Sequence, residues 1–248
     1  MSKIKPYNSD SSKTKEVETM FDNIAHSYDF MNTVMSFGLH RLWRNKALRL
    51  ALKRLNLNNR QANILDVATG TGDLVFHLHR LLPKATITGI DLSSGMLNIA
   101  RRKLNLREGT AAEKITFAEA DCLDLPFKDD SFDLVTVAYG VRNFEEIGKG
   151  LAEMARVLRP GGTLCVIELS EPKGKIPRRL YKLYTRTLIP SVGRLVSHDH
   201  RAYTYLPESI AAAPQRERLT ALMKAAGLSN PQFIDLSFGA ATIYLASK

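Results

Sequence analysis

Three aspartates stand at or just beyond the ends of short apolar segments that are typical of buried β-strands. Asp66 lies near the end of the first segment, Asp91 ends the second, and Asp121 follows the third. The carboxyl ends of parallel strands meet at one edge of a sheet, so we expect the three carboxylates around one crevice. Fixed negative charges there favour a cationic nucleoside such as S-adenosylmethionine and repel a pyrophosphate. Each acid could instead cap a helix or bond a loop, but their coincidence at successive strand ends favours a ligand site.

A glycine-containing loop follows the first segment, with the sequence Asp66-Val67-Ala68-Thr69-Gly70-Thr71-Gly72-Asp73. Gly70 and Gly72 allow a tight turn and a close approach of the backbone to a ligand. A dinucleotide-binding loop would carry a third glycine where Val75 stands, and the Lys-Ser/Thr pair of a P-loop is absent. The loop therefore favours a nucleoside that carries no pyrophosphate.

The residues after the second and third segments predict how that nucleoside would be held. Asp91 lies 19 residues after Gly72, where a carboxylate can accept hydrogen bonds from both ribose hydroxyls. Asp121 could accept a bond from the adenine amino group, and Cys122 could contribute its backbone amide. The Cys122 thiol is expected to pack rather than to react.

Strands and helices alternate along the chain, which predicts a doubly wound, Rossmann-like α/β fold. Strands are expected at 63–67, 85–91, 115–120, 132–138, 163–168, 232–236 and 242–246. Helices are expected at 17–57 with a break at 32–38, and at 73–82, 94–104, 147–158 and 214–226. The last two strands are too close for a parallel crossover, so one should run antiparallel. The prediction is a mostly parallel seven-stranded sheet with one antiparallel strand near the C-terminus and an N-terminal helical cap.

One domain is expected from residue 15 to 248, preceded by a flexible tail at 1–14 that lacks apolar periodicity. Within it we expect a helical cap at 15–60, a cofactor-binding core at 61–170 and a basic helical insert or substrate lid at 171–213. A C-terminal helix and strand pair should occupy 214–248.

The composition excludes several classes of protein. Of the 248 residues, 44% are hydrophobic, which is too many for a disordered chain. No apolar run approaches the roughly 18 residues that span a bilayer, and the first 19 residues lack the apolar core of a secretory signal. The two cysteines, Cys122 and Cys165, are far apart, which excludes a disulfide scaffold or a zinc finger. A soluble, cytoplasmic protein without a metal site is expected.

The net charge of +10 is concentrated outside the core. The segment 173–194 contains seven Lys and Arg residues and no acid, and its apolar residues recur with helical spacing. Such a helix could pack on the core with a solvated basic side, or it could lie on anionic lipid. Nucleic-acid binding is not expected, because basic and aromatic residues are not interleaved on one module.

Several motifs resemble those of class I S-adenosylmethionine-dependent methyltransferases. They are Asp66-x-Ala-x-Gly70-x-Gly72, Asp91, Ala120-Asp121, Leu125-Pro126-Phe127, Phe132-Asp133 and Arg159-Pro160-Gly161-Gly162. Longer motifs resemble the quinone-ring C-methyltransferases of menaquinone and ubiquinone biosynthesis. They are Tyr28-Asp29-x-Met31-Asn32, Met35-Ser36-Phe37-Gly38-x-His40-Arg41-x-Trp43, Tyr139-Gly140-Val141-Arg142-Asn143, and the stretch from Asp199 to Ile210. The resemblance covers the chain from about residue 19 to its C-terminus.

This resemblance implies methyl transfer to a ring carbon of a prenylated quinol. Demethylmenaquinol is the expected acceptor, with the ubiquinone-pathway benzoquinol as the alternative; RNA methylation and non-catalytic nucleic-acid binding are weaker alternatives. Family analogy places cofactor contacts on Thr71, Asp91, Asp121 and Cys122. A further contact falls on Ala138, where the family has a serine, so only its backbone can take part.

Ring methylation needs a bound quinol, a route for its hydroxyl proton and stabilisation of the charge that develops on the ring. Arg142 is expected to stabilise a phenolate or orient a water, because arginine does not normally lose its proton. Asn143 could hold a ring hydroxyl, and Tyr28 could close over the ring. Candidate bases are His198, His40 and Asp199. Because the substrate carries a lipid tail, peripheral contact with the inner face of an anionic membrane is a further hypothesis. A homodimer is a separate hypothesis for the assembly.

Overall fold

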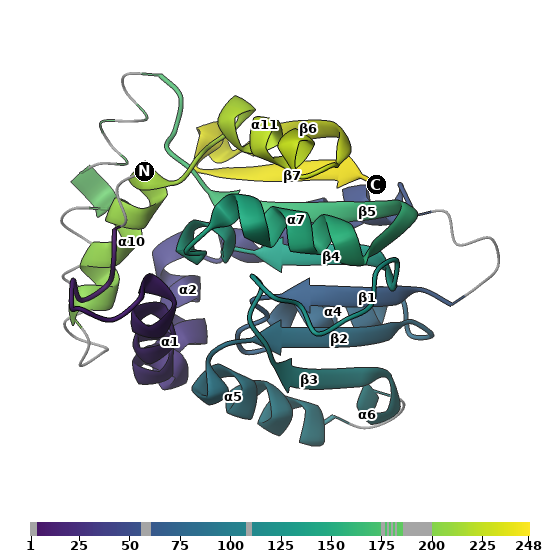
Figure 1. The fold of residues 1–248 in the computed structure, drawn as a ribbon. Helices are drawn as coiled ribbons and strands as arrows, with labels where there is room; N and C mark the ends of the chain where they lie inside the picture. The colour runs from purple at the N-terminus through teal and green to yellow at the C-terminus, as the bar shows by residue number, and fades with distance from the viewer. Residues whose placement is uncertain are drawn as a thin grey trace.

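A seven-stranded sheet forms the centre of the chain (Figure 1) in a computed structural model that describes residues 4–55, 61–107, 111–174, 177, 179, 181, 183–185 and 200–248. The strand order is β3-β2-β1-β4-β5-β7-β6. The strands are β1 (Asn63–Val67), β2 (Thr86–Asp91), β3 (Ile115–Glu119), β4 (Phe132–Ala138), β5 (Leu158–Leu169), β6 (Ser229–Leu236) and β7 (Ala241–Ser247).

Strands β1 to β5 pair in parallel, whereas β7 runs antiparallel to both of its neighbours, β5 and β6. The chain leaves β1 on one side towards β2 and β3 and returns to its other side with β4 and β5. A crevice forms at such a reversal, beyond the carboxyl ends of the strands. The predicted fold class, including its single antiparallel strand, is confirmed.

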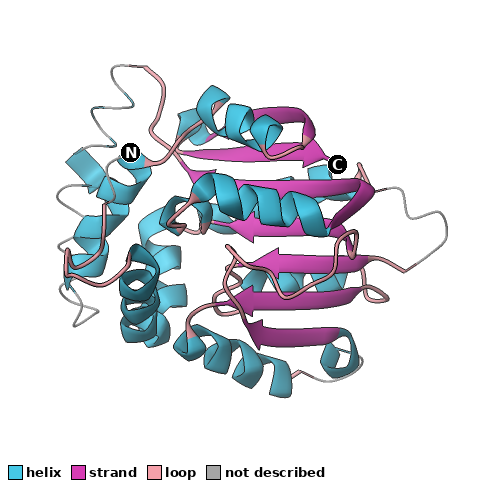
Figure 2. Cartoon of the chain, viewed as in Figure 1, coloured by secondary structure: helices cyan, strands magenta, loops and turns pink. Residues whose placement is uncertain are grey.

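Helices cover both faces of the sheet and the carboxyl ends of its parallel strands (Figures 1 and 2). Helices α3, α4 and α5 share one apolar cluster with the sheet, and α7 and α11 share the cluster on the opposite face. Helices α1, α2 and α10 lie across the strand ends (Figure 1). The longer helices are α1 (Lys13–Ile24), α2 (Tyr28–Ser36), α3 (Leu39–Leu52), α4 (Asp73–Leu81), α5 (Ser94–Asn105), α7 (Ile147–Val157), α10 (His200–Ala212) and α11 (Glu217–Ala225). The short ones are η1 (Ala25–Ser27), α6 (Ala111–Lys114), η2 (Val141–Asn143) and η4 (Ser237–Gly239).

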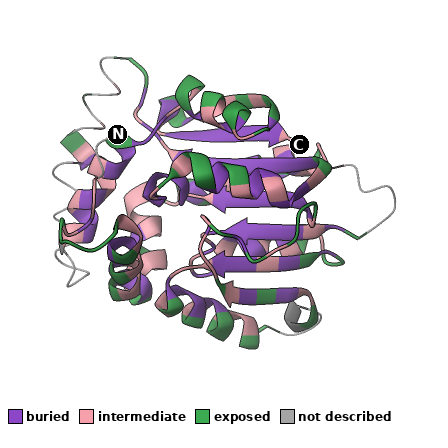
Figure 3. Cartoon of the chain, in the orientation of Figure 1, coloured by how far each residue is buried: buried purple, intermediate pink, exposed green. Residues whose placement is uncertain are grey.

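The central strands are buried on both faces because helices cover both (Figure 3). In β1, Ile64 belongs to the cluster with α3 and α4, whereas Leu65 and Val67 belong to the cluster with α7. This alternation follows from the two-residue period of a strand. None of the described helices has both the length and the apolar character needed to cross a lipid bilayer.

The N-terminal segment differs in detail from the predicted boundaries. Helix α1 begins at Lys13, inside the expected tail. The backbone amides of Tyr7, Asn8 and Ser9 donate to the buried carboxylate of Glu16, which joins these residues to α1. A break in the helix was expected at 32–38, but α2 continues to Ser36. Only Phe37 and Gly38 interrupt it, with left-handed φ angles of 49° and 75°.

The predicted helices are present with ends shifted by a few residues, and two of these shifts have a local cause. The helix expected at 147–158 ends at Val157, and the Arg159-Pro160 pair lies in an early extended part of β5. Proline disfavours a helical conformation in the residue before it, so the chain leaves the helix ahead of this pair. The helix expected from residue 214 begins at Glu217, because Arg216 has a positive, non-helical φ of 54°.

Candidate active site

The loop after β1 is shaped by residues with left-handed backbone angles. Ala68, Gly70 and Gly72 have φ values of 51°, 57° and 79°. A Cβ atom on Gly72 would lie 2.8 Å from the Phe117 ring, so the loop needs glycine at this position for both its angle and its packing. The loop therefore turns sharply from β1 into the N-terminus of α4.

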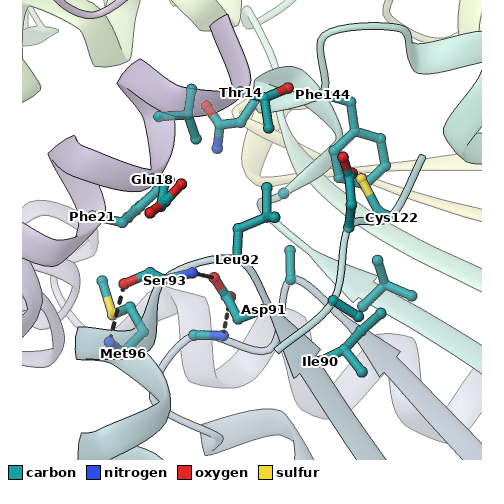
Figure 4. Close-up of a pocket in the computed structure, with 18 of the residues that line it drawn as sticks. Thr14, Glu18, Phe21, Ile90, Asp91, Leu92, Ser93, Met96, Cys122 and Phe144 are labelled. Carbon is teal, nitrogen blue, oxygen red and sulfur yellow. Dashed lines mark hydrogen bonds between the residues drawn. The ribbon is translucent and has the colours of Figure 1, made fainter. Parts of the chain in front are cut away.

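Asp91 joins this loop to the loop after β2 (Figure 4). Its Oδ2 accepts a hydrogen bond of 2.8 Å from the Gly70 amide, and its Oδ1 accepts one of 3.0 Å from the Ser93 amide. Burial raises the pKa of the Asp91 carboxyl, and the bonds from these amides oppose that rise. Asp91 thus fixes the relative position of two loops at adjacent strand ends.

A cavity opens beside these two loops, and we call it the acidic cavity. It is lined by four carboxylates, those of Glu18, Asp91, Asp121 and Glu145, and by no Lys or Arg among the described residues. Figure 4 shows Glu18 on the same helix as Phe21, whereas Asp91 lies below it at the end of a strand. A cavity whose described lining has four carboxylates and no Lys or Arg favours a cationic ligand.

Five of the eight predicted cofactor residues line the acidic cavity: Gly70, Asp91, Asp121, Cys122 and Ala138. Asp121 also accepts a 2.8 Å bond from the Leu123 amide, which holds the loop after β3. Burial raises the pKa of the Cys122 thiol, so this side chain remains protonated and packs, as predicted.

The other three predicted cofactor residues, Asp66, Thr71 and Gly72, do not line the acidic cavity. Asp66 is buried on the other face of β1, because side chains alternate along a strand. Its carboxylate accepts hydrogen bonds of 2.7 Å from Thr69 and 2.5 Å from Thr136. The expectation that Asp66 shares one crevice with Asp91 and Asp121 was therefore wrong.

The buried position of Asp66 predicts a pH-dependent stability. Burial raises its pKa from 3.8 to about 6. In this interval the folded chain holds more protons than the unfolded chain, so the free energy of unfolding falls as the pH rises, by up to about 3 kcal/mol. Asp66→Asn should remove this slope in urea denaturation measured at about pH 4 and about pH 7. An equal difference between wild type and variant at both pH values would contradict the assignment.

A second cavity of about 250 Å³ adjoins the first, and we call it the aromatic cavity. Its lining is dominated by Met, Leu, Ile and aromatic side chains and includes no Asp or Glu among the described residues. Five buried polar atoms of its lining residues have no hydrogen-bond partner: Tyr139 Oη, Arg142 Nε, Asn143 Oδ1, Tyr203 Oη and Tyr205 Oη. Unpartnered buried polar atoms are costly, so their concentration here favours an apolar pocket that accepts a ligand carrying polar groups.

Arg142 supplies the positive charge of the aromatic cavity. Its Nη1 donates to Glu168 Oε1 at 2.8 Å and to the Tyr139 carbonyl oxygen, and its backbone amide donates to Glu168 Oε2 at 3.1 Å. Both side chains of this ion pair are more than 90% buried. The nearby Glu168 keeps the pKa of Arg142 raised, so the guanidinium remains charged.

Tyr28 and Asn143, both predicted to contact the ring, lie where the two cavities meet. Each lines both cavities, as do Phe21 and Tyr139. Tyr139 also has a left-handed φ of 60°, a strained angle for an aromatic residue. Arg142 lines the aromatic cavity alone. The structure thus brings together three of the four predicted catalytic residues.

Of the three candidate bases, the structure describes His40 alone. His198 and Asp199 lie outside the described residues. His40 lines the aromatic cavity, and its Nδ1 is 2.6 Å from Ser36 Oγ. Burial and the charges of Arg44 and Arg41 lower the pKa of His40 to about 4, which makes it a weak proton acceptor.

Comparison with known proteins identifies the group to which this site belongs. The chain matches the sequence profile of the ubiE/COQ5 methyltransferase family over residues 9–248. The chain belongs to this family. A demethylmenaquinone methyltransferase of Bacteroides fragilis is 46% identical over 247 residues, which cover 99% of this chain and 98% of that protein. A ubiquinone/menaquinone biosynthesis C-methyltransferase of Geotalea daltonii is 40% identical over 95% of this chain and 97% of its own length.

Solved structures show the same fold as this ubiE/COQ5 family member. An S-adenosylmethionine-dependent methyltransferase of Thermotoga maritima superposes with a TM-score of 0.62 at 20% identity, over 93% of this chain and 99% of that one. Family membership confirms the predicted methyltransferase activity and S-adenosylmethionine as its cofactor. Two carboxylates of the acidic cavity, Glu18 and Glu145, were missed, because Glu18 lies within α1 and Glu145 lies between η2 and α7, so neither directly follows a strand.

Proposed function

We propose that this protein transfers a methyl group from S-adenosylmethionine to a ring carbon of a prenylated quinol, converting demethylmenaquinol to menaquinol. One observation carries the proposal: a cavity with four carboxylates and no Lys or Arg in its described lining adjoins an apolar cavity whose described lining carries one arginine and no acid. The first suits a sulfonium, and the second suits an uncharged ring that acquires negative charge. The relatives named demethylmenaquinone methyltransferase favour the naphthoquinol over the benzoquinol.

The residues of both cavities have complementary roles in this proposal. Bound S-adenosylmethionine supplies an electrophilic methyl group. Asp91 would accept bonds from the ribose hydroxyls, and Asp121 would accept one from the adenine. Asn143 Oδ1, which has no partner, would accept the hydrogen of a ring hydroxyl.

Charge stabilisation falls to Arg142. A phenolate in the aromatic cavity would be attracted to its guanidinium, which Glu168 holds in place. Such preorganised charge in an apolar pocket lowers the barrier to reaction more than the same charge would in water. His198 stays a prediction for the proton acceptor, and a homodimer stays a prediction for the assembly.

A methyl-transfer assay tests the proposed reaction. Wild type is incubated with S-adenosylmethionine and either reduced demethylmenaquinol or its benzoquinol counterpart, and the products are identified by mass spectrometry. Replacement of one ring hydrogen by a methyl group, a net mass gain of CH2, is expected on the naphthoquinol, with less on the benzoquinol. Asn143→Ala should lower turnover without removing cofactor binding. Absence of product from both quinols would contradict the acceptor assignment.

The surface of α3 supports peripheral membrane contact. Phe37 and Leu39 line the aromatic cavity and yet are 75% and 38% exposed, so they lie where this cavity meets the surface. Leu42, one turn further, is 64% exposed. Helix α3 contains no acid, and its exposed Arg41 and Lys46 form no ion pair within the described part of the chain. Exposed apolar residues followed by free cations are typical of a helix that lies on anionic lipid.

Flotation with vesicles of mixed neutral and anionic lipid tests this surface. Leu42→Glu combined with Arg41→Glu should reduce the vesicle-bound fraction several-fold, because it removes apolar burial and adds repulsion. Leu106→Glu is the matched control, since Leu106 is 86% exposed at the end of α5. Equal flotation of both variants would contradict a role for α3. The basic segment 173–194 lies largely outside the described residues, and Arg178, Lys182 and Arg186 changed to Glu provide a separate test of it.

A further inference from the structure

Two aromatic residues separate the acidic cavity from the aromatic cavity. Phe21 on α1 and Tyr28 at the start of α2 each line both cavities. Their rings pack edge to face, with centroids 5.9 Å apart. We call them the aromatic partition. Each is followed directly in sequence by an aspartate, Asp22 and Asp29.

Asp22 binds the loop that follows β2. Its Oδ1 accepts a hydrogen bond of 2.6 Å from Ser93 Oγ and one of 2.9 Å from the Gly95 amide. A Cβ atom on Gly95 would lie 2.9 Å from the same oxygen, so this approach requires glycine. The Ser93 amide in turn donates to Asp91. The residue after Phe21 is therefore linked through one serine to the predicted ribose-binding carboxylate.

Asp29 binds the loop that follows β1. Its Oδ1 accepts a 2.6 Å bond from Thr71 Oγ1, and its Oδ2 accepts a 2.5 Å bond from Lys103 Nζ. Lys103 also donates to Thr71 Oγ1 at 3.0 Å and to Asp73 at 2.8 Å. The Thr71 side chain is thus engaged with the cap, which accounts for its absence from the acidic cavity.

Asp22 and Asp29, which we call the two anchors, therefore both connect the aromatic partition to loops that border the acidic cavity. Partly exposed ion pairs such as that of Asp29 and Lys103 add little to stability alone. Their arrangement has a different consequence, because each anchor joins a cofactor-side loop to a residue that shapes the aromatic cavity. A ligand that fixes these loops also restricts the motion of the aromatic partition. A second ligand in the aromatic cavity then loses less conformational entropy on binding, which favours its binding.

We propose that Asp22 and Asp29 are positioning residues that couple the two cavities, so that an occupied acidic cavity raises the affinity of the aromatic cavity for its ligand. The identity of that ligand as a quinol rests on the proposed function. The coupling is reciprocal: the quinol raises the affinity for the cofactor by the same factor. Couplings of this kind typically range from about 5-fold to about 150-fold.

Hydrogen exchange on the full chain, with and without S-adenosylhomocysteine, tests the coupling without any quinol. In wild type the ligand should slow exchange at least about fivefold in α1 and α2. In Asp22→Ala/Asp29→Ala this protection should fall below about twofold, while the loops after β1 and β2 remain protected. The Asp22→Asn/Asp29→Ala variant keeps the one Asp22 oxygen that accepts both hydrogen bonds and should regain part of the effect. Unchanged protection of α1 and α2 in the alanine variant would overturn the proposal.

Steady-state kinetics provides the second readout. The alanine variant should raise the quinol KM roughly tenfold, with a smaller change in the S-adenosylmethionine KM measured at low quinol. A variant that had merely lost stability would lower the amount of active enzyme and leave both KM values unchanged. If wild type methylates neither quinol, the proposed function fails, and hydrogen exchange still decides the coupling.

Discussion

Asp91→Ala is expected to weaken the binding of S-adenosylmethionine at least about 100-fold. The carboxylate has two tasks, because it accepts bonds from the Gly70 and Ser93 amides and faces the acidic cavity where ribose hydroxyls would bind. A hydrogen bond to a charged group contributes about 1.5–3 kcal/mol, and two such bonds to the ribose correspond to a factor of about 100 or more. Loss of the bridge between the two loops adds to that effect.

Titration calorimetry with S-adenosylmethionine measures this loss, and circular dichroism establishes that the variant is folded. Asp124→Ala is the matched control, because Asp124 is an exposed aspartate three residues beyond Asp121 and does not line the acidic cavity. The control should bind like wild type. Binding by Asp91→Ala within about threefold of wild type would contradict the placement of the ribose.

Arg142→Ala is expected to abolish methyl transfer and to destabilise the fold by about 3–5 kcal/mol. Removing the guanidinium leaves Glu168 buried without its counter-charge, with bonds from the Arg142 and Leu169 amides alone. For a chain of this size each kcal/mol lowers the melting temperature by about 2–4 °C, so a decrease of roughly 6–20 °C is expected.

A double-mutant cycle with Glu168→Ala separates the structural from the chemical role of Arg142. The double variant buries no unpaired charge, so it should regain much of the stability lost in Arg142→Ala. Its methyl transfer should nevertheless remain undetectable, since no positive charge faces the ring. Recovery of activity together with stability would show that Arg142 is only structural. Calorimetric melting and the mass-spectrometric assay supply the two measurements.

The sequence predicted the sheet and most of the named residues that line the two cavities, because both depend on local patterns. Buried strands such as β4 are short apolar runs that can be recognised in the sequence. Asp91 is the last residue of β2, so predicting this strand also predicts that Asp91 lies at the carboxyl edge of the sheet. Gly70 and Gly72 stand out by residue type alone. Asp66 was predicted at the same crevice as Asp91, but neighbouring residues of a strand point to opposite faces of the sheet. An error of one position in the predicted strand end therefore puts the side chain on the wrong face.

The remainder of the site depends on contacts between residues distant in sequence. Asp22 meets Ser93, and Asp29 meets Thr71, across 71 and 42 positions. An aspartate near a helix end is common, and neither its spacing nor its type indicates a partner that far away. The contribution of α1 to the acidic cavity through Glu18 has the same origin, because the angle at which the cap crosses the strand ends is a tertiary property.

The position of β7 has a consequence for how the chain is made. Although β7 follows β5 and β6 in sequence, it lies between them and pairs with both. Until residues 241–247 emerge from the ribosome, β5 and β6 each present an open edge that can capture another nascent chain. The sheet therefore cannot close before β7 is available, and chaperones that shield such edges should matter most until then.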